Sequence, residues 1–116
     1  MARHNTIGNE GEELAKKYLV EAGYKIITTN FRYKRAEIDL IAEKEKRLIF
    51  VEVKTRSGNA FGEPEAFVSK KKASLIIDAA DHFIYMNNWL FDIRFDIISV
   101  AVNPEVKIYH FEDAFY

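Results

Sequence analysis

Two segments of the chain place apolar and small residues at the spacing of one helical face. In residues 7–22 these positions are Ile7, Gly11, Leu14, Ala15, Tyr18, Leu19 and Ala22. In the second segment, which follows Ser69 and runs to about residue 86, they are Ala73, Ile76, Ile77, Ala80, Phe83 and Ile84. Ser69 is suited to cap a helix, and the pair Asn87-Asn88 is suited to end one. The pattern therefore predicts two amphipathic helices.

Five further segments are rich in β-branched and other apolar residues, which is typical of strands. They are residues 24–29, 37–43, 47–56, 91–102 and 106–111. Residues 30–36 have the composition of a basic, aromatic connection, and the glycines and proline of residues 57–68 indicate a loop or flap. Residues 48–51 are apolar without alternation, so their strand is expected at the centre of a sheet. The predicted order is α-β-β-β-α-β-β.

The second and third predicted strands are joined by a short charged stretch and are expected to form an antiparallel hairpin. If Glu45 and Lys46 are the two loop residues, Asp39 lies directly opposite Glu52, with Cβ atoms about 5 Å apart on one face. Glu-Lys is not a typical sequence for such a turn, and a slip of one residue would rotate the side chains to the other face.

The composition describes one soluble globular domain spanning residues 1–116. Of these residues 48% are hydrophobic and 30% are charged, and none is cysteine. The absence of cysteine excludes thiolate catalysis, cysteine-ligated zinc and disulfides. No apolar run approaches the roughly 20 residues of a membrane span. The N-terminus lacks the apolar region of a secretory signal, so a cytoplasmic location is expected.

The net charge of −1 conceals an asymmetry along the chain. Residues 1–72 contain 15 Lys and Arg against 11 Asp and Glu, a net charge of +4, whereas residues 73–116 contain 2 against 7, a net charge of −5. A basic region can bind nucleic acid even when the whole chain is near neutral.

Three charged residues, Asp39, Glu52 and Lys54, lie inside otherwise apolar strand segments. A buried charge costs several kcal/mol unless it is paired or bound to a metal, so these positions indicate a site. Two adjacent carboxylates repel unless a proton or a cation lies between them, and oxygen ligands favour Mg²⁺ or Mn²⁺ over zinc. A metal there would activate water for phosphodiester hydrolysis, with Lys54 orienting that water or stabilising the transition state.

The first predicted helix offers a third acid. On a helical wheel centred on Gly11, Glu12 lies at about 100°, at the edge of the apolar face, whereas Glu13 at about 200° points to solvent. Glu12 is therefore the acid that is able to reach inward.

These residues resemble the metal-dependent PD-(D/E)XK nuclease superfamily in its Holliday junction resolvase-like arrangement, and more closely the YraN-like bacterial proteins. The matching strings are Gly11-Glu12 with Ala15 and Tyr18-Leu19, Glu37-Ile38-Asp39-Leu40-Ile41-Ala42, Phe50-Val51-Glu52-Val53-Lys54-Thr55-Arg56, Phe61-Gly62 with Pro64, and Arg94-Phe95-Asp96. Two positions depart from the pattern, since Ala36 replaces a common Gly and Ile38 replaces the Pro of the superfamily.

The resemblance implies an α/β fold with a three-layer, restriction-endonuclease-like core, in which helices flank a mixed sheet. It also implies an Mg²⁺-dependent or Mn²⁺-dependent endonuclease. In this assignment Asp39 and Glu52 bind the metal, and Glu12 and Lys54 complete the catalytic set.

A structural interpretation of the same residues stays open. Asp39, Glu52 and Lys54 would then form an ion-pair network, with Glu37 as the partner of Lys54 across the hairpin. Glu12 would be a solvated acid at the edge of its helix.

Further basic residues are candidates for a rim that binds the phosphate backbone of a nucleic acid. They are Arg32, Lys34, Arg35, Arg56, Lys70, Lys71 and Lys72. Exposed surface charge is the alternative for all of them. For Asp96, a hydrogen bond with nearby backbone is a sufficient explanation. His4, His82 and His110 do not have the spacing of metal ligands, and we expect them to have no role in a site.

Two hypotheses follow. The first is an endonuclease that hydrolyses DNA phosphodiester bonds, with branched DNA in repair or recombination among the candidate substrates. The second is a non-catalytic nucleic-acid-binding or assembly module that retains the nuclease fold. In both, the small size leaves room for a second copy of the chain or a partner protein to help grip an extended substrate.

Overall fold

A computed structural model describes residues 6–57 and 68–115. Within them the chain forms two helices and five strands: α1 (Thr6–Glu21), β1 (Lys25–Tyr33), β2 (Ala36–Lys44), β3 (Arg47–Arg56), α2 (Lys70–Asn87), β4 (Asp92–Ala101) and β5 (Lys107–Phe111). This is the order predicted from the hydrophobic pattern. The loop predicted over residues 57–68 falls almost entirely outside the described residues, as do His4, Phe61, Gly62 and Pro64 of the sequence analysis.

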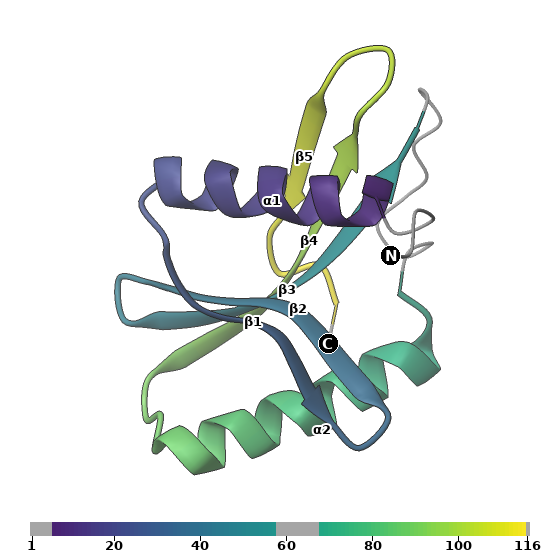
Figure 1. Ribbon diagram of the computed structural model, residues 1–116. Coiled ribbons are helices and arrows are strands. Elements are labelled where there is room, and N and C mark those ends of the chain that lie inside the picture. The colour runs from purple at the N-terminus through teal and green to yellow at the C-terminus, as the bar shows by residue number, and fades with distance from the viewer. Residues whose placement is uncertain (1–5, 58–67, 116) are drawn as a thin grey trace.

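The strands form one mixed sheet in the order β1-β2-β3-β4-β5. The neighbours β3 and β4 are parallel, and the other neighbouring pairs are antiparallel. A parallel pair needs a long crossover connection, and α2 lies within it. Figure 1 shows the sheet between the helices, with α1 across one face and α2 along the other. The expected three-layer α/β arrangement is confirmed.

Each face of the sheet has its own apolar cluster. The cluster beneath α1 consists of Ala15, Leu19, Tyr24, Leu40, Ala42, Ile49, Val51, Ile98 and Val100. The cluster beneath α2 consists of Ala36, Ile38, Ile41, Leu48, Phe50, Val68, Ile76, Ala79, Ala80, Phe83, Phe95 and Ile97. Because successive residues of β3 enter opposite clusters, both faces of this strand are covered, as its uninterrupted apolar run predicted.

β1 is longer than predicted, and the expectation of a connection over residues 30–36 is wrong for most of that segment. The strand continues to Tyr33, and only Lys34 and Arg35 separate it from β2. Phe31 and Tyr33 pack against the cluster beneath α2, whereas Arg32 between them is exposed. Alternation of side chains thus explains the strand, because its basic residues point outward while its aromatic residues point inward.

The hairpin between β2 and β3 has the predicted two-residue turn. Lys44 pairs with Arg47, and the predicted register continues along β2 as far as Leu40. Glu45 and Lys46 have φ values of 54° and 60°, the left-handed conformation that a type I′ turn requires. This turn matches the twist of the flanking strands, so the hairpin imposes a backbone conformation that these two side chains rarely adopt.

The second helix begins and ends where the sequence predicted. The Oγ of Ser69 accepts a hydrogen bond from the backbone N of Lys72 at 3.1 Å, which is an N-cap. At the other end Asn88 has a φ of 51°, and its backbone N–H donates to the carbonyl oxygens of Ile84 and Tyr85. Neither helix, over the residues described, combines the length and apolarity that crossing a membrane requires.

Candidate functional site

The second strand changes the direction of its side chains at Asp39. Residues two apart normally share a face of a strand, yet Ile38 packs beneath α2 and Leu40 packs beneath α1. The neighbouring strand β1 carries Asn30 at this level, with a φ of 53°. This local irregularity leaves the Asp39 side chain lining a pocket on the α2 side of the sheet.

Asp39 is a mostly buried carboxylate next to a second acid. Its Oδ2 accepts a hydrogen bond from the backbone N of Val53 on β3 at 2.8 Å. Burial raises the pKa of Asp39 from 3.8 to about 8, and the charge of Glu52 acts in the same direction, whereas the hydrogen bond from Val53 opposes both. The fold therefore brings together in one pocket the two carboxylates that the predicted register placed opposite each other.

Glu52 is the second acid, and it is only 6% exposed. It follows Phe50 by two positions on β3, so its side chain points towards α2. There its Oε2 accepts a hydrogen bond from the Nζ of Lys72, in the first turn of that helix. The lining of one pocket is shared by Arg35, Ala36, Glu37, Asp39, Glu52, Lys72, Leu75 and Ile76.

The first helix lies very close to β3 at Thr55, three positions beyond Glu52. Gly11 is buried, and a Cβ atom added to it would overlap the side chain of Thr55. A glycine is therefore required for this approach of helix to strand. The next residue is Glu12, whose position on the wheel predicted that it reaches inward, and its side chain is partly buried.

Glu12 belongs to the same electrostatic environment as the two strand carboxylates. Burial and the charge of Glu37 raise the pKa of Glu12, and a hydrogen bond with Asn30 opposes this shift. Glu12 in turn contributes to the raised pKa of Asp39. We refer to Glu12, Asp39 and Glu52 as the acidic site.

The remaining residues of the predicted catalytic hairpin lie beside the acidic site. Lys54 is partly buried on β3, two positions beyond Glu52 and therefore on the same face. Glu37, the partner that the structural interpretation gives to Lys54, forms an ion pair with Arg32 of the adjacent strand at 3.7 Å. A catalytic role for Lys54 stays a prediction.

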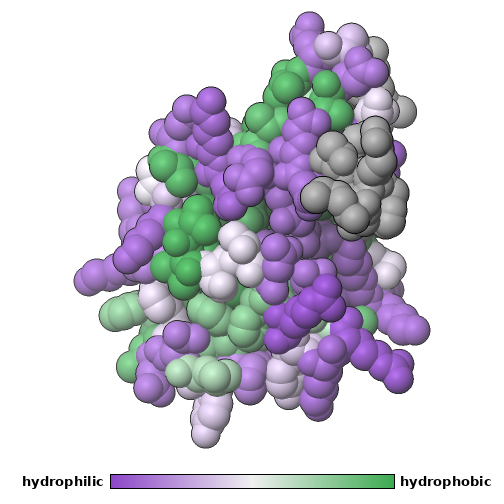
Figure 2. All heavy atoms as spheres, viewed as in Figure 1, coloured by the Kyte–Doolittle hydropathy of each residue, from purple (hydrophilic) through white to green (hydrophobic). Residues whose placement is uncertain are grey.

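The basic residues predicted to bind nucleic acid lie in three places. Arg32 on β1 and Lys34 and Arg35 in the turn that follows it are exposed, and Arg56 is partly buried at the end of β3. Lys70 and Lys71 are exposed at the start of α2, whereas Lys72 reaches into the acidic site. Figure 2 shows hydrophilic residues gathered around this end of α2 and the adjoining end of the β1–β2 hairpin. Binding of nucleic acid by these residues stays a prediction.

Asp39 and Glu52 are better suited to a hydrated metal ion than to one that protein ligands enclose. Across residues 6–57 and 68–115, no group of three or more His, Asp or Glu side chains is arranged to hold a metal ion. Asp39 and Glu52 are two adjacent carboxylates, however, and Mg²⁺ is commonly bound through one or two carboxylates while it keeps several waters. The raised pKa of Asp39 shows that a second negative charge is unfavourable beside Glu52, and a divalent cation in place of the proton would stabilise that charge. The pair therefore fits a hydrated Mg²⁺ or Mn²⁺, not a metal enclosed by protein ligands.

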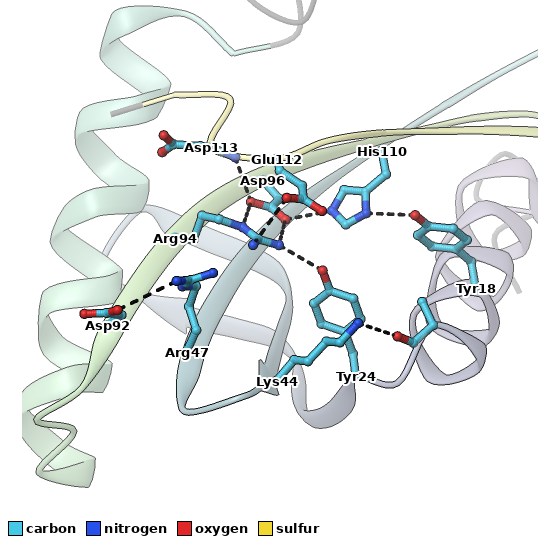
Figure 3. A network of polar contacts seen from close by, with 11 residues as sticks. Tyr18, Tyr24, Lys44, Arg47, Asp92, Arg94, Asp96, His110, Glu112 and Asp113 are labelled. Atoms are coloured by element: carbon cyan, nitrogen blue, oxygen red, sulfur yellow. Dashed lines mark hydrogen bonds and ion pairs between the residues drawn. The ribbon is translucent and has the colours of Figure 1, made fainter.

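A second buried polar cluster centres on Asp96 of β4 (Figure 3). Arg94 donates to both carboxylate oxygens of Asp96 at 2.8 Å, the Nε2 of His110 lies 2.7 Å from one of them, and the backbone N of Asp113 donates to the other at 3.0 Å. Burial alone would raise the pKa of Asp96, but the hydrogen bonds of His110, Arg94 and Asp113 together lower it. Asp96 is therefore ionised at neutral pH, and its three hydrogen-bonding partners stabilise the negative charge.

The same cluster links α1, β4 and β5 with Tyr24 in the connection between α1 and β1. The Nδ1 of His110 lies 2.9 Å from the hydroxyl of Tyr18 on α1, and Arg94 donates to the hydroxyl of Tyr24 at 2.9 Å. Burial raises the pKa of Tyr18, so its hydroxyl stays protonated at neutral pH. We refer to Tyr18, Tyr24, Arg94, Asp96 and His110 as the Asp96 network.

Sequence reasoning missed this network and the place of Lys72. The expectation that His110 is incidental is wrong, because both ring nitrogens contact polar groups. A usable signal was present in Arg94 and Asp96, which stand two apart among the apolar residues Ile93, Phe95 and Ile97, like the charged residues of β3. The contacts of Lys72 and His110 cross between elements, so no local pattern indicates them.

Comparisons with known proteins place the chain in a family. Residues 11–100 match the model of the uncharacterised protein family UPF0102. The chain is 48% identical to UPF0102 protein FP2501 of Flavobacterium psychrophilum, over 100% of this chain and 98% of that protein. It is 43% identical to a UPF0102 protein of Christiangramia forsetii over the same shares. The solved structure of Pyrococcus furiosus SfsA in complex with Ca²⁺ is similar with a TM-score of 0.38 and 15% identity, covering 94% of this chain and 63% of that one. The chain belongs to the uncharacterised protein family UPF0102.

Proposed function

We propose that this chain is a metal-dependent nuclease that hydrolyses phosphodiester bonds of DNA. One observation carries the proposal: the buried carboxylate of Glu52 and the partly buried carboxylate of Asp39 share a pocket, and the pKa of Asp39 is raised to about 8. A folded protein keeps such an unfavourable arrangement when the charge has a use, and perturbed carboxylates in a pocket are candidates for a functional site.

Asp39 and Glu52 would hold the metal, and Mg²⁺ or Mn²⁺ suits their oxygen ligands. When bound, the metal supplies a Lewis acid for the phosphate and lowers the pKa of a water ligand. The hydrogen bond from Val53 to Asp39 fixes the orientation of one carboxylate across the hairpin, which is how neighbours commonly support a ligand.

Lys54 and Glu12 would act around this pair. Lys54 shares a face of β3 with Glu52, so its ammonium can orient the attacking water or stabilise the negative charge that develops on the phosphate. Glu12 approaches from α1 and would hold the metal through water, since Mg²⁺ retains part of its hydration shell. The attacking oxygen forms a bond to phosphorus as the bond from phosphorus to the leaving sugar oxygen breaks.

The decisive experiment is cleavage of branched, flapped and single-stranded DNA in Mg²⁺ or Mn²⁺. Asp39→Ala and Lys54→Ala are each expected to lower the cleavage rate by more than about a hundredfold, because each removes several kcal/mol of transition-state stabilisation. Glu12→Gln is compared with Glu13→Gln, since Glu13 is the adjacent acid whose side chain is 71% exposed. Only the change at Glu12 should reduce the rate.

Equal activity of the wild type, Asp39→Ala and Lys54→Ala would refute the proposal. The second hypothesis, a non-catalytic DNA-binding module, predicts something else: DNA binding that survives EDTA, tolerates Glu52→Gln and weakens steeply with salt. Circular dichroism of each variant separates loss of activity from loss of folding. If Glu52→Gln unfolds the chain, the carboxylates have a structural role.

A further inference from the structure

Lys72 is the cation that the fold supplies to the acidic site. Its Nζ bonds to the Oε2 of Glu52, and both residues line the pocket that contains Asp39. The side chain of Glu52 is 7% exposed, whereas that of Lys72 is 46% exposed. One partner is therefore fixed in the protein and the other can reach water without moving its backbone.

The backbone at Lys72 is well fixed even though its side chain is half exposed. Its N–H donates to Ser69, which caps the helix. The first turn of α2 contains three consecutive lysines and no acid, an arrangement that the helix dipole disfavours. Glu52 compensates for one of these lysines, and Lys72 compensates for one of the two adjacent carboxylates. The ion pair therefore offsets both the repulsion between the lysine and the helix dipole and the repulsion between the two carboxylates.

We propose that Lys72 is an exchangeable counter-ion of the acidic site. It binds Glu52 while the site lacks a metal, and it transfers to a phosphate of DNA when a divalent cation takes its place at the carboxylates. This inference rests on the proposed function and adds a positioning residue to it. It assigns Lys72 a place inside the site instead of on the outer rim with Lys70 and Lys71.

The exchange predicts opposite effects of one substitution on two ligands. Lys72→Met removes a competitor of the cation, so Mn²⁺ alone should bind about two- to fivefold more tightly in calorimetry, the range expected for a half-exposed ion pair. The same variant loses a phosphate contact, so labelled DNA in Ca²⁺ should bind about two- to fivefold more weakly, with the salt slope reduced by about one.

Lys71→Met is the matched control. Lys71 is exposed and adjacent in sequence, and its side chain leaves the helix about 100° away from that of Lys72. It should leave Mn²⁺ affinity unchanged. Lys72→Gln serves as a second variant, since a neutral amide still donates to Glu52 if Lys72→Met compromises folding.

The outcomes separate this inference from the proposed function. Tighter Mn²⁺ binding together with weaker DNA binding supports the exchange. Mn²⁺ affinity that is unchanged or lower in both Lys72 variants overturns it while leaving the metal-dependent nuclease intact. A wild-type chain that binds no Mn²⁺ overturns both.

Discussion

Two aspartates that are shielded from solvent, Asp96 completely and Asp39 in part, have opposite electrostatic environments. Asp96 receives Arg94, His110 and a backbone N–H, and these contacts lower its pKa despite complete burial. Asp39 receives one backbone N–H and faces Glu52, and its pKa rises to about 8. Burial pushes both pKa values upward, so the difference comes from the neighbours.

Asp96 is a carboxylate that stabilises the fold, whereas Asp39 is a carboxylate whose ionised form the fold disfavours. The Asp96 network joins α1, the α1–β1 connection, β4 and β5 through compensated charges and hydrogen bonds. The acidic site collects like charges, and Lys72 at Glu52 balances them in part. Stability should therefore depend on Asp96, whereas activity should depend on Asp39, and the following substitutions test this division.

The largest effect on stability is expected for Asp96→Asn. The change removes the buried charged partner of Arg94, whose side chain is 14% exposed, and leaves Arg94 with its weaker ion pair to the more exposed Glu112 at 3.5 Å. Loss of a buried partner typically costs about 3–5 kcal/mol. Urea denaturation measures this loss, and Asp92→Asn, an exposed acid on the same strand, should change stability by less than about 0.5 kcal/mol. Similar stabilities of the two variants would remove the structural role of the Asp96 network.

Asp39→Asn should shift stability in the opposite direction and with a different pH dependence. The folded chain keeps the Asp39 proton up to about pH 8, whereas the unfolded chain releases it near 3.8, so this contribution is complete below about pH 4 and is lost as pH rises through 8. Asparagine does not ionise, so the variant does not lose this stability as pH rises. Its side-chain oxygen still accepts the hydrogen bond from the backbone N of Val53. The variant should be about 1–3 kcal/mol more stable than the wild type above pH 8.

Urea midpoints measured from pH 4 to pH 9 check this prediction. The Asp39→Asn variant should match the wild type near pH 4 and exceed it increasingly as pH rises. Asp96 has the opposite sign: its contribution is present above its ordinary pKa and is lost as pH falls through the lowered value. Parallel pH profiles for the wild type and Asp39→Asn would contradict the account of Asp39.

Gly11→Ala tests the helix that connects the two regions, since α1 carries Glu12 at one and Tyr18 at the other. The added Cβ overlaps Thr55, and such overpacking typically costs about 1–3 kcal/mol. Thr55→Ala in the same chain should recover part of that loss. Denaturation of the single and double variants measures the coupling, and additive effects would show that the contact is not the cause.

The smallest effect is expected for Tyr18→Phe. The substitution removes the hydroxyl that contacts His110, and one such hydrogen bond contributes about 0.5–1.5 kcal/mol. Tyr85→Phe is the control because that side chain is exposed. A loss as large as that of Asp96→Asn would mean that the network depends on Tyr18 instead of on the central ion pair.

The register of the β2–β3 hairpin was predicted correctly from Lys44 to Leu40, although Glu-Lys is not a typical sequence for a two-residue turn. A two-residue turn at Glu45 and Lys46 gives the register observed from Lys44 to Leu40, and one further step along that register opposes Asp39 to Glu52. The apolar residues of both strands must reach the same two faces, and this requirement specifies the register. That requirement is strong enough to hold Glu45 and Lys46 in left-handed conformations. Along β1 the same reasoning failed, since the basic residues were taken as a connection and their outward alternation was not recognised.

The sequence alone determined the order of elements, the central position of β3, the helix cap at Ser69 and the inward side of Glu12. These follow from periodicity and local backbone chemistry, which act over a few residues. Only the tertiary structure decided that Lys72 meets Glu52, that His110 joins Tyr18 to Asp96, and that Asp39 lacks the compensation that Asp96 has. Charges interact through space, so their balance depends on which elements pack together.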